Sequence, residues 1–356
     1  MTITNTKTRT NLGADSVRKV YEMLQVDDDW AAWDGDGFSW WAKDYRQRIW
    51  AEPGVEDNGE TIFKICAVTD FLKEVADDDG LEEKLSVLGK FASTYGQVWD
   101  VLDRTVKLWT SYYVHEQNAD WAVPLFAQAS IVQVVDAQIR TEIMAKLLGG
   151  RPETTPHPLH GVRPTPDDML NVVERVYVPL GERASLWAQT EEFEEAARMI
   201  SISGAFANGG ATGVTSEFPF GEDTAMVTIE TRQPHPQLGN GLLVRLNLPI
   251  QLPAERANRL AVSLNALEIV SFVRSHFVGS WCVTEVGGSF MPVYVAFYPN
   301  AFHRPGLVLN LLMGSGLRAR WVREEILPDG MDSDIYEILA ARLLRWKRRG
   351  LLLDGN

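Results

Sequence analysis

The chain has 356 residues, of which 45% are hydrophobic and 23% charged, and this is the composition of a soluble globular protein with room for two domains. Its formal net charge of −14 argues against nucleic acid or an anionic membrane surface as a partner, because both require clustered Lys and Arg. Two cysteines without a disulfide framework, a polar N-terminus without the apolar core of a signal peptide, and no apolar stretch of membrane-spanning length predict a cytoplasmic protein.

The first half of the chain is predicted to alternate helices with strands. A first helix is expected to be capped by Asp15 or Ser16, and strand-like segments follow it. Asn58-Gly59 lies between two of them and predicts a hairpin, because both residues tolerate positive φ. The residues predicted to line one face of the next helix are Leu81, Leu85, Leu88 and Phe91. Two more strands and a long helix complete this half.

The middle of the chain is predicted to be a linker, because residues 151–167 contain five prolines and no apolar periodicity. His157 and His160 lie within it, three positions apart. No nearby Cys, Asp or Glu completes a zinc site, so we expect both histidines in solvent. The other histidines are scattered and form no local cluster.

The second half repeats the order of the first. Residues 168–200 are predicted to be a helical insert, and a Gly-rich break precedes three strands, a helix, two strands joined by Gly287-Gly288, and a closing helix. Paired residues keep an offset of 181 to 183 positions: Phe63 and Val244, Phe91 and Phe272, Trp99 and Trp281, Tyr112 and Tyr294, Ile143 and Ile326. Each half therefore reads helix, three strands, helix, two strands, helix, which predicts a tandem duplication. The alternative is two unrelated α+β units.

Two segments carry a resemblance to a known family. In "GLLVRLNLPIQLPAERANRLAVSLNALE" (241–268) and "GSWCVTEVGGSFMPVYVAFYPN" (279–300), an apolar strand, a helix opened by Pro and a Trp-bearing hairpin follow one another. This order resembles the type III secretion chaperone-like fold, including the bacterial YbjN-type domains, over roughly 28–145 and 210–327. The resemblance implies a protein-binding module that is often dimeric, here a pseudo-dimer within one chain.

The predicted fold class is α+β, with two tandem similar domains that each pack an antiparallel sheet on helices. The predicted organisation is a disordered start (1–14), a first chaperone-like domain (15–150), a Pro-rich linker (151–167), a second chaperone-like domain with an N-terminal helical insert (168–327) and a C-terminal amphipathic helix (328–356).

An aromatic cluster in the first half is a candidate partner-binding site. Its members are Trp30, Trp33, Phe38, Trp40, Trp41, Tyr45 and Trp50, of which Trp33, Trp40, Trp41 and Trp50 are the candidate partner-binding residues. Residues 24–80 around it carry 15 Asp and Glu against 5 Lys and Arg. Such a cluster can anchor a basic, partly apolar segment of a partner, or it can simply fill the core. Because adjacent strand residues face opposite sides, either Trp40 or Trp41 must be covered by a neighbour or left for a ligand.

The C-terminal helix adds three candidate partner-binding residues, Trp346, Arg348 and Arg349. Its basic end complements the helix dipole, and it is expected to dock on an acidic surface of the same chain or of a second copy. A solvated tail and a nucleic-acid contact are the alternatives.

Motifs for chemistry are few. There is no P-loop, and "VDDDWAAWDGDGF" (26–38) fails the spacing of a calcium loop, so neither cofactor nor metal is expected. We therefore predict a non-enzymatic adaptor that binds a protein or peptide client, with a homodimer as a further expected assembly. The alternatives are a small-molecule sensor that uses the cleft between the halves, or an enzyme built from distant carboxylates such as Asp70 or Glu285.

Overall fold

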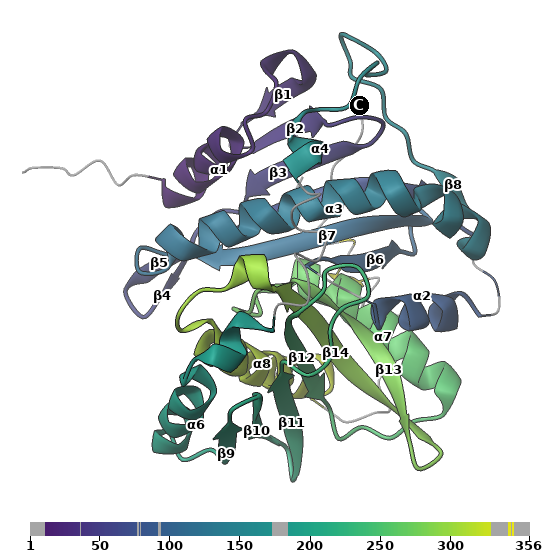
Figure 1. Cartoon of the computed structure of the whole chain (residues 1–356). Coiled ribbons are helices and arrows are strands. Elements are labelled where there is room, and N and C mark those ends of the chain that lie inside the picture. The colour runs from purple at the N-terminus through teal and green to yellow at the C-terminus, as the bar shows by residue number, and fades with distance from the viewer. Residues whose placement is uncertain are drawn as a thin grey trace, which may run out of the picture.

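The computed structural model describes residues 11–328, except 36, 77, 79, 92–93 and 173–183, together with 341, 342 and 344. This part of the chain forms two antiparallel sheets packed on helices, which confirms the predicted α+β class. The first half lies at the top of Figure 1 and the second half at the bottom.

The first half contains three helices and one sheet. The helices are α1 (Leu12–Met23), α2 (Leu81–Gly89) and α3 (Ala119–Leu148). The strands are β1 (Ala31–Asp34), β2 (Gly37–Trp41), β3 (Arg46–Ala51), β4 (Val55–Asp57), β5 (Glu60–Lys73), β6 (Gly96–Asp100) and β7 (Thr105–Val114). The predicted cap of α1 is wrong: Asn11 is the N-cap and accepts a hydrogen bond from the N–H of Ala14 at 3.3 Å, so the helix includes residues expected to be disordered.

The second half has the same kind of elements. Its helices are α6 (Glu192–Ile202), α7 (Ala254–Val270) and α8 (Leu307–Trp321), and a π-turn follows over Val322–Ile326. Its strands are β9 (Ala207–Gly210), β10 (Gly213–Phe220), β11 (Asp223–Glu230), β12 (Gly241–Asn247), β13 (Gly279–Val286) and β14 (Ser289–Pro299). Short elements between the halves are β8 (Arg151–Pro152), α4 (Met169–Val172) and a 3-10 turn over Leu186–Gln189.

The two sheets share one strand order. It is β1-β2-β3-β5-β7-β6 in the first and β9-β10-β11-β12-β14-β13 in the second, with β4 and β8 as additional partners of β5. Of the strands in this shared order, four and not three precede the middle helix of each half, because β1 and β9 are short and were not predicted. α6 occupies the chain position of α1, so it belongs to the repeat and not to an insert.

The strand registers test the paired residues of the repeat. Ile65 lies opposite Tyr112, and Leu246 lies opposite Tyr294, so β5–β7 and β12–β14 keep the predicted offset. The pairing of Trp99 with Trp281 is wrong, because Trp99 lies opposite Val106 whereas Trp281 lies opposite Tyr294. The β6–β7 and β13–β14 hairpins therefore differ in strand register, whereas the β5–β7 and β12–β14 pairs have the same register.

Glycine and asparagine set two hairpins as predicted. Asn58 and Gly59 have φ of 49° and 84° between β4 and β5. Gly287 and Gly288 have φ of 60° and 83° between β13 and β14. Both pairs occupy the left-handed region that two-residue hairpin turns require.

Helix α3 is the central helix of the first half and lies along β7, packed on β5 and β7 (Figure 1). Among the described residues it is the one helix long and apolar enough to cross a membrane by composition, but 72% of that apolar window is buried inside the protein. It is packed as a core helix. It ends at Gly149, whose φ of 69° closes the helix as predicted.

The halves meet through equivalent elements. α2 packs on α7 and on β13, and α7 packs in turn on β6 of the first half. The largest cluster of buried apolar side chains contains residues of both halves. This exchange is the arrangement of an isologous dimer interface, here within one chain.

Candidate functional site

Each sheet has an inner face, which packs on the long helix of its own half, and an outer face on the opposite side. In the first sheet, Trp40 and Gln47 lie on the inner face, where Gln47 donates to Gln133 of α3 at 2.8 Å. In the second sheet, Trp281 and Tyr294 lie on the inner face with Arg318 of α8. The outer faces differ most between the halves.

The outer face of the second sheet forms an open groove of about 690 Å³. Its apolar floor consists of Leu243, Cys282, Val283, Val293, Val295 and Phe297. The C-terminal end of α2 and the loop before β12 form its walls. These floor side chains are themselves at most 9% exposed, and Leu238 of the loop before β12 packs with most of them in one buried cluster. The apolar surface that solvent reaches at this groove therefore lies around the floor.

Three large apolar side chains at this groove are exposed to solvent. Phe91, Met226 and Val286 have exposed fractions of 54%, 43% and 56%. Phe91 was predicted to line the packed face of α2, and this prediction is wrong. Because α2 ends at Gly89, Phe91 lies beyond the helix at the mouth of the groove.

A histidine turn shapes one wall of the groove. The backbone of His235 pairs with that of Gly239, and Nδ1 of His235 accepts the N–H groups of Gln237 and Leu238, both at 3.2 Å. An Nδ1 that accepts must be unprotonated, and burial lowers the pKa of His235. His157 and Gly161 form the same turn, so His-Pro-x-x-Gly occurs twice, a signal that the sequence analysis missed.

The predicted linker covers the part of the outer face of the first sheet around Trp41, and the second half covers the part around Lys64 and Tyr113. Trp41 Nε1 donates to the carbonyl of Thr155 at 2.6 Å, and the Trp41 ring lies 4.6 Å from that of His157. Arg163 donates to the Trp41 carbonyl at 2.9 Å. Residues 151–167 are therefore a packed cover and not a solvated linker, and His157 is only 3% exposed.

The burial of the predicted tryptophans corrects the first partner-binding site. Trp40 (0%), Trp41 (4%) and Trp50 (6%) are buried, and Trp50 packs edge-on against Trp109 at 5.4 Å. They fill the two faces of the first sheet, so they have no surface left for a partner. Trp33, with 48% exposed, alone among these four is accessible.

The predicted C-terminal site is a different case, because Trp346, Arg348 and Arg349 lie outside the described residues. Upstream of them, Arg342 donates to the hydroxyl of Ser271 at 3.1 Å and to the carbonyl of Glu325 at 3.0 Å.

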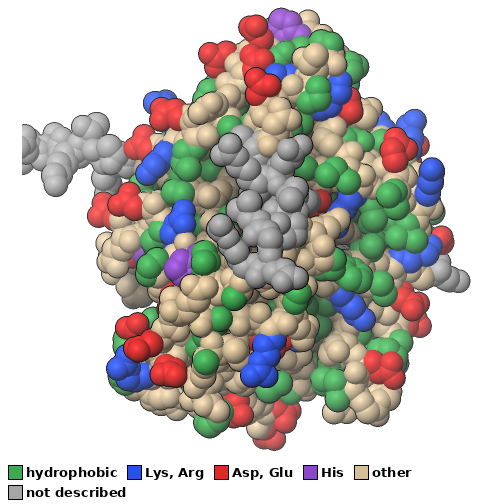
Figure 2. Space-filling view, in the orientation of Figure 1, with side chains coloured by type: hydrophobic (Ala, Val, Ile, Leu, Met, Phe, Trp, Pro, Cys, Tyr) green, Lys and Arg blue, Asp and Glu red, His purple; other side chains and the backbone are tan. Residues whose placement is uncertain are grey.

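Charged side chains on the face seen in Figure 2 are scattered among apolar ones and do not gather into one patch. A group of apolar side chains gathers over the C-terminal half of α3, where Ile139, Ile143 and Leu147 are 57%, 68% and 46% exposed. This is a convex helix surface, unlike the groove.

A second, smaller cavity of about 170 Å³ lies at the seam between the halves. His115 of the first half and His276 of the second both line it, although the sequence shows them as scattered. Hydrogen bonds connect the two halves at this seam. Lys64 of β5 donates to the carbonyls of Ile269 and Ser271, and its positive charge stabilises the negative end of the α7 dipole.

The carboxylates proposed for an enzyme do not meet. Asp70 lies on the first sheet, where Lys107 and Arg46 contact it at 2.9 and 3.1 Å. Burial raises the pKa of Asp70, but these two cations outweigh burial and hold its pKa below the usual range. Glu285 lies on the exposed β13–β14 hairpin of the other sheet. Among the described residues, no three His, Cys, Asp or Glu side chains are grouped to hold a metal.

Comparison with known proteins returned no matching family model, no matching curated protein and no matching solved structure. The resemblance to the chaperone-like family stays a prediction.

Proposed function

We propose that this protein is a non-enzymatic, chaperone-like adaptor of the cytoplasm that holds a segment of a client protein in the groove of the second sheet. The observation that carries the proposal is the exposure of Phe91, Met226 and Val286 around one concave, apolar floor. A groove of about 690 Å³ lies within the range of roughly 300–1,000 Å³ that is usual for binding clefts.

The occupant we propose is an amphipathic helix of the client. Helix α2 already packs on the outer face of the second sheet, where Gly89 approaches Ser280 and Cys282 of β13. A client helix beside α2 continues the same layer over β11, β12 and β14. Lys90 and Arg245 lie at the groove, and Arg245 pairs with Glu230 at 2.9 Å. This leaves an excess of positive charge at the groove, which favours an acidic residue on the client helix.

The test starts from a photo-crosslinking amino acid placed at Phe91 in the full-length protein. Crosslinked peptides from the native cytoplasm are mapped by mass spectrometry, and the mapped segment is synthesised and titrated by fluorescence anisotropy. We expect a peptide with apolar residues at helical spacing. The triple variant Phe91→Ser, Met226→Ser, Val286→Ser should bind it at least about tenfold more weakly, because that ratio needs only ~1.4 kcal/mol of lost apolar contact.

The matched control is Ile139→Ser, Ile143→Ser, Leu147→Ser, which removes three equally exposed apolar side chains from the convex surface of α3. It should bind like the wild type. Equal binding by the groove variant, or loss of binding in the α3 variant only, contradicts the proposal. Variants at Trp40 or Trp41 are unsuitable for this test, because both side chains are buried.

A further inference from the structure

The seam cavity has an apolar side and a polar side. It lies between β7 of the first half and β14 and α8 of the second. The apolar side consists of Ile62, Val244, Ala296, Leu311, Met313 and Leu317. The polar lining includes His276, Tyr294, Tyr298 and Arg318, each of which carries a hydrogen-bond donor, and further polar residues at Tyr113, His115, Asn118, Arg274, Ser275, Asn310 and Ser315.

The protonation of His276 follows from its contacts. Its Nδ1 accepts the backbone N–H of Tyr113 at 3.2 Å, so Nδ1 carries no proton. Burial, together with the charges of Arg318 and His115, lowers the pKa of His276 to about 3. The neutral ring therefore keeps its proton on Nε2, which has no hydrogen-bond partner among the described residues. Nε2 of His276 is a free donor in a cavity-lining side chain.

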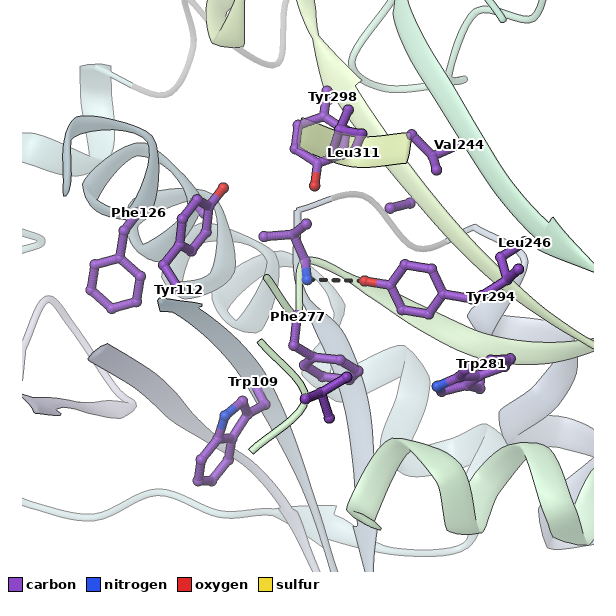
Figure 3. Close-up of a cluster of buried hydrophobic side chains, with 14 of the residues drawn as sticks. Trp109, Tyr112, Phe126, Val244, Leu246, Phe277, Trp281, Tyr294, Tyr298 and Leu311 are labelled. Atoms are coloured by element: carbon purple, nitrogen blue, oxygen red, sulfur yellow. Dashed lines mark hydrogen bonds between the residues drawn. The ribbon is translucent and has the colours of Figure 1, made fainter. Parts of the chain in front are cut away.

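Tyrosine hydroxyls supply further donors. Figure 3 shows Tyr112, Tyr294 and Tyr298 in one cluster of buried side chains, with the hydroxyl of Tyr294 directed at a backbone nitrogen. Tyr294 accepts the N–H of Val278 at 3.1 Å, so its own O–H remains available. Tyr298 is 2% exposed and bonds to none of the described residues, and burial raises its pKa well above the usual range, which keeps its proton in place.

Arg318 directs one edge of its guanidinium to a structural partner. Nε and Nη2 contact Glu268 at 2.7 and 2.6 Å, and Nη2 also donates to the carbonyl of His276 at 2.9 Å. Nη1 has no partner among the described residues. The guanidinium stacks on Tyr294, 3.8 Å from the ring centroid, which holds this free edge in place.

We propose that the seam cavity binds a small carboxylic acid whose carboxylate accepts hydrogen bonds from Arg318, His276 and Tyr298 and whose short apolar tail lies against Val244 and Leu311. The free donors of Arg318, His276 and Tyr298 favour an electron-rich acceptor, and a planar carboxylate suits a guanidinium edge. The volume of about 170 Å³ admits an acid of a few carbons and excludes a nucleotide. The apolar side favours an alkyl tail over inorganic phosphate.

Binding of such an acid would tie the halves together. His276 belongs to the loop after α7, and this loop bridges to β7 through Ser111 and Phe277 as well as through Tyr113. Occupancy of the cavity therefore strengthens the contact between the two sheets, which is how a ligand at a seam stabilises one arrangement.

The test is calorimetric titration and thermal unfolding of the full-length protein with acetate, propionate and butyrate at millimolar concentration. Propionamide, which has the shape without the charge, and inorganic phosphate, which has charge without the tail, are titrated in parallel. We expect at least one acid to bind and to raise Tm, with propionamide and phosphate at least tenfold weaker.

Tyr298→Phe should weaken acid binding at least tenfold without lowering Tm of the free protein, because its hydroxyl has no protein partner. Tyr21→Phe, far from the seam, should bind like the wild type. The proposal is overturned if no acid shifts Tm of the wild type, if propionamide or phosphate binds as well as the acids, or if Tyr298→Phe binds equally well. If the variant fails to fold, the titrations of the wild-type protein with the acids, propionamide and phosphate still test the proposal.

Discussion

The two sheets share a strand order, but their outer faces differ in how far the chain covers them. Around Trp41 the first is covered by residues 151–167, whose Thr155 and His157 pack on this side chain, and the second has an open groove with Phe91 and Met226 at its edge. A His-Pro-x-x-Gly turn lies at each outer face. The turn at His157 belongs to the segment that covers the first sheet, and the turn at His235 forms a wall of the groove on the second sheet. A repeated topology thus provides two similar surfaces, of which the chain covers one itself.

The inner faces differ as well, and the largest expected effect lies there. Arg318→Met leaves Glu268 buried without its cation, so the free energy of unfolding should fall by roughly 3–5 kcal/mol in urea denaturation. Arg320→Met, two residues further along on the exposed side of α8, breaks only a surface pair with Glu324 and should cost at most about 1 kcal/mol. Equal costs for both would show that the ion pair plays no special part in the second core.

The cover of the first outer face is tested next. Trp41→Ala removes a buried ring and its bond to Thr155, so unfolding should become easier by about 3 kcal/mol, and limited proteolysis should cut faster within residues 151–167. Trp33→Ala, which removes an exposed ring, should change stability by less than about 1 kcal/mol. An unchanged proteolysis pattern in Trp41→Ala would mean that the cover does not depend on this contact.

The seam between the halves should respond to acid. The pKa of His276 is lowered to about 3 from an ordinary value near 6.5, so the unfolded chain binds the proton more readily. Its stabilising contribution is present above about pH 6.5 and falls as pH decreases, by roughly 1–2 kcal/mol between pH 7 and pH 5. His276→Asn keeps an acceptor for Tyr113 and should show a flatter pH profile of urea midpoints than the wild type. A parallel profile would assign the acid sensitivity to other groups.

The smallest effect on stability should come from the groove itself. Phe91→Ser, Met226→Ser and Val286→Ser together remove side chains that are about half exposed, so the urea midpoint should shift by less than that of Trp41→Ala although client binding is lost. A large destabilisation would mean that these residues support the second sheet and are not free for a partner.

The sequence predicts much of the fold because the relevant signals are local. The Asn58-Gly59 turn, the end of α3 at Gly149 and the repeated order of elements are all confirmed. The short strands β1 and β9 were missed because acidic and glycine-rich residues surround them and hide any alternation.

The sites depend on contacts between distant residues, which no local pattern contains. Trp41 is covered by a carbonyl 114 positions away. His115 and His276 meet only because the halves dock, and Phe91 is exposed only because α2 ends before it on the second sheet. The tryptophan cluster was read as a surface for a partner because burial of each ring is decided by these long-range contacts.

The exchange of α2 and α7 across the seam has a consequence for synthesis on the ribosome. Helix α2 finishes its packing only against β13, whose first residue, Gly279, leaves the ribosome long after Gly89. Until then the emerging N-terminal half exposes apolar surface that nothing in the nascent chain can yet cover. Completion of this fold must therefore wait for the second half, and truncated products of translation stalled before β13 should be recognised and degraded.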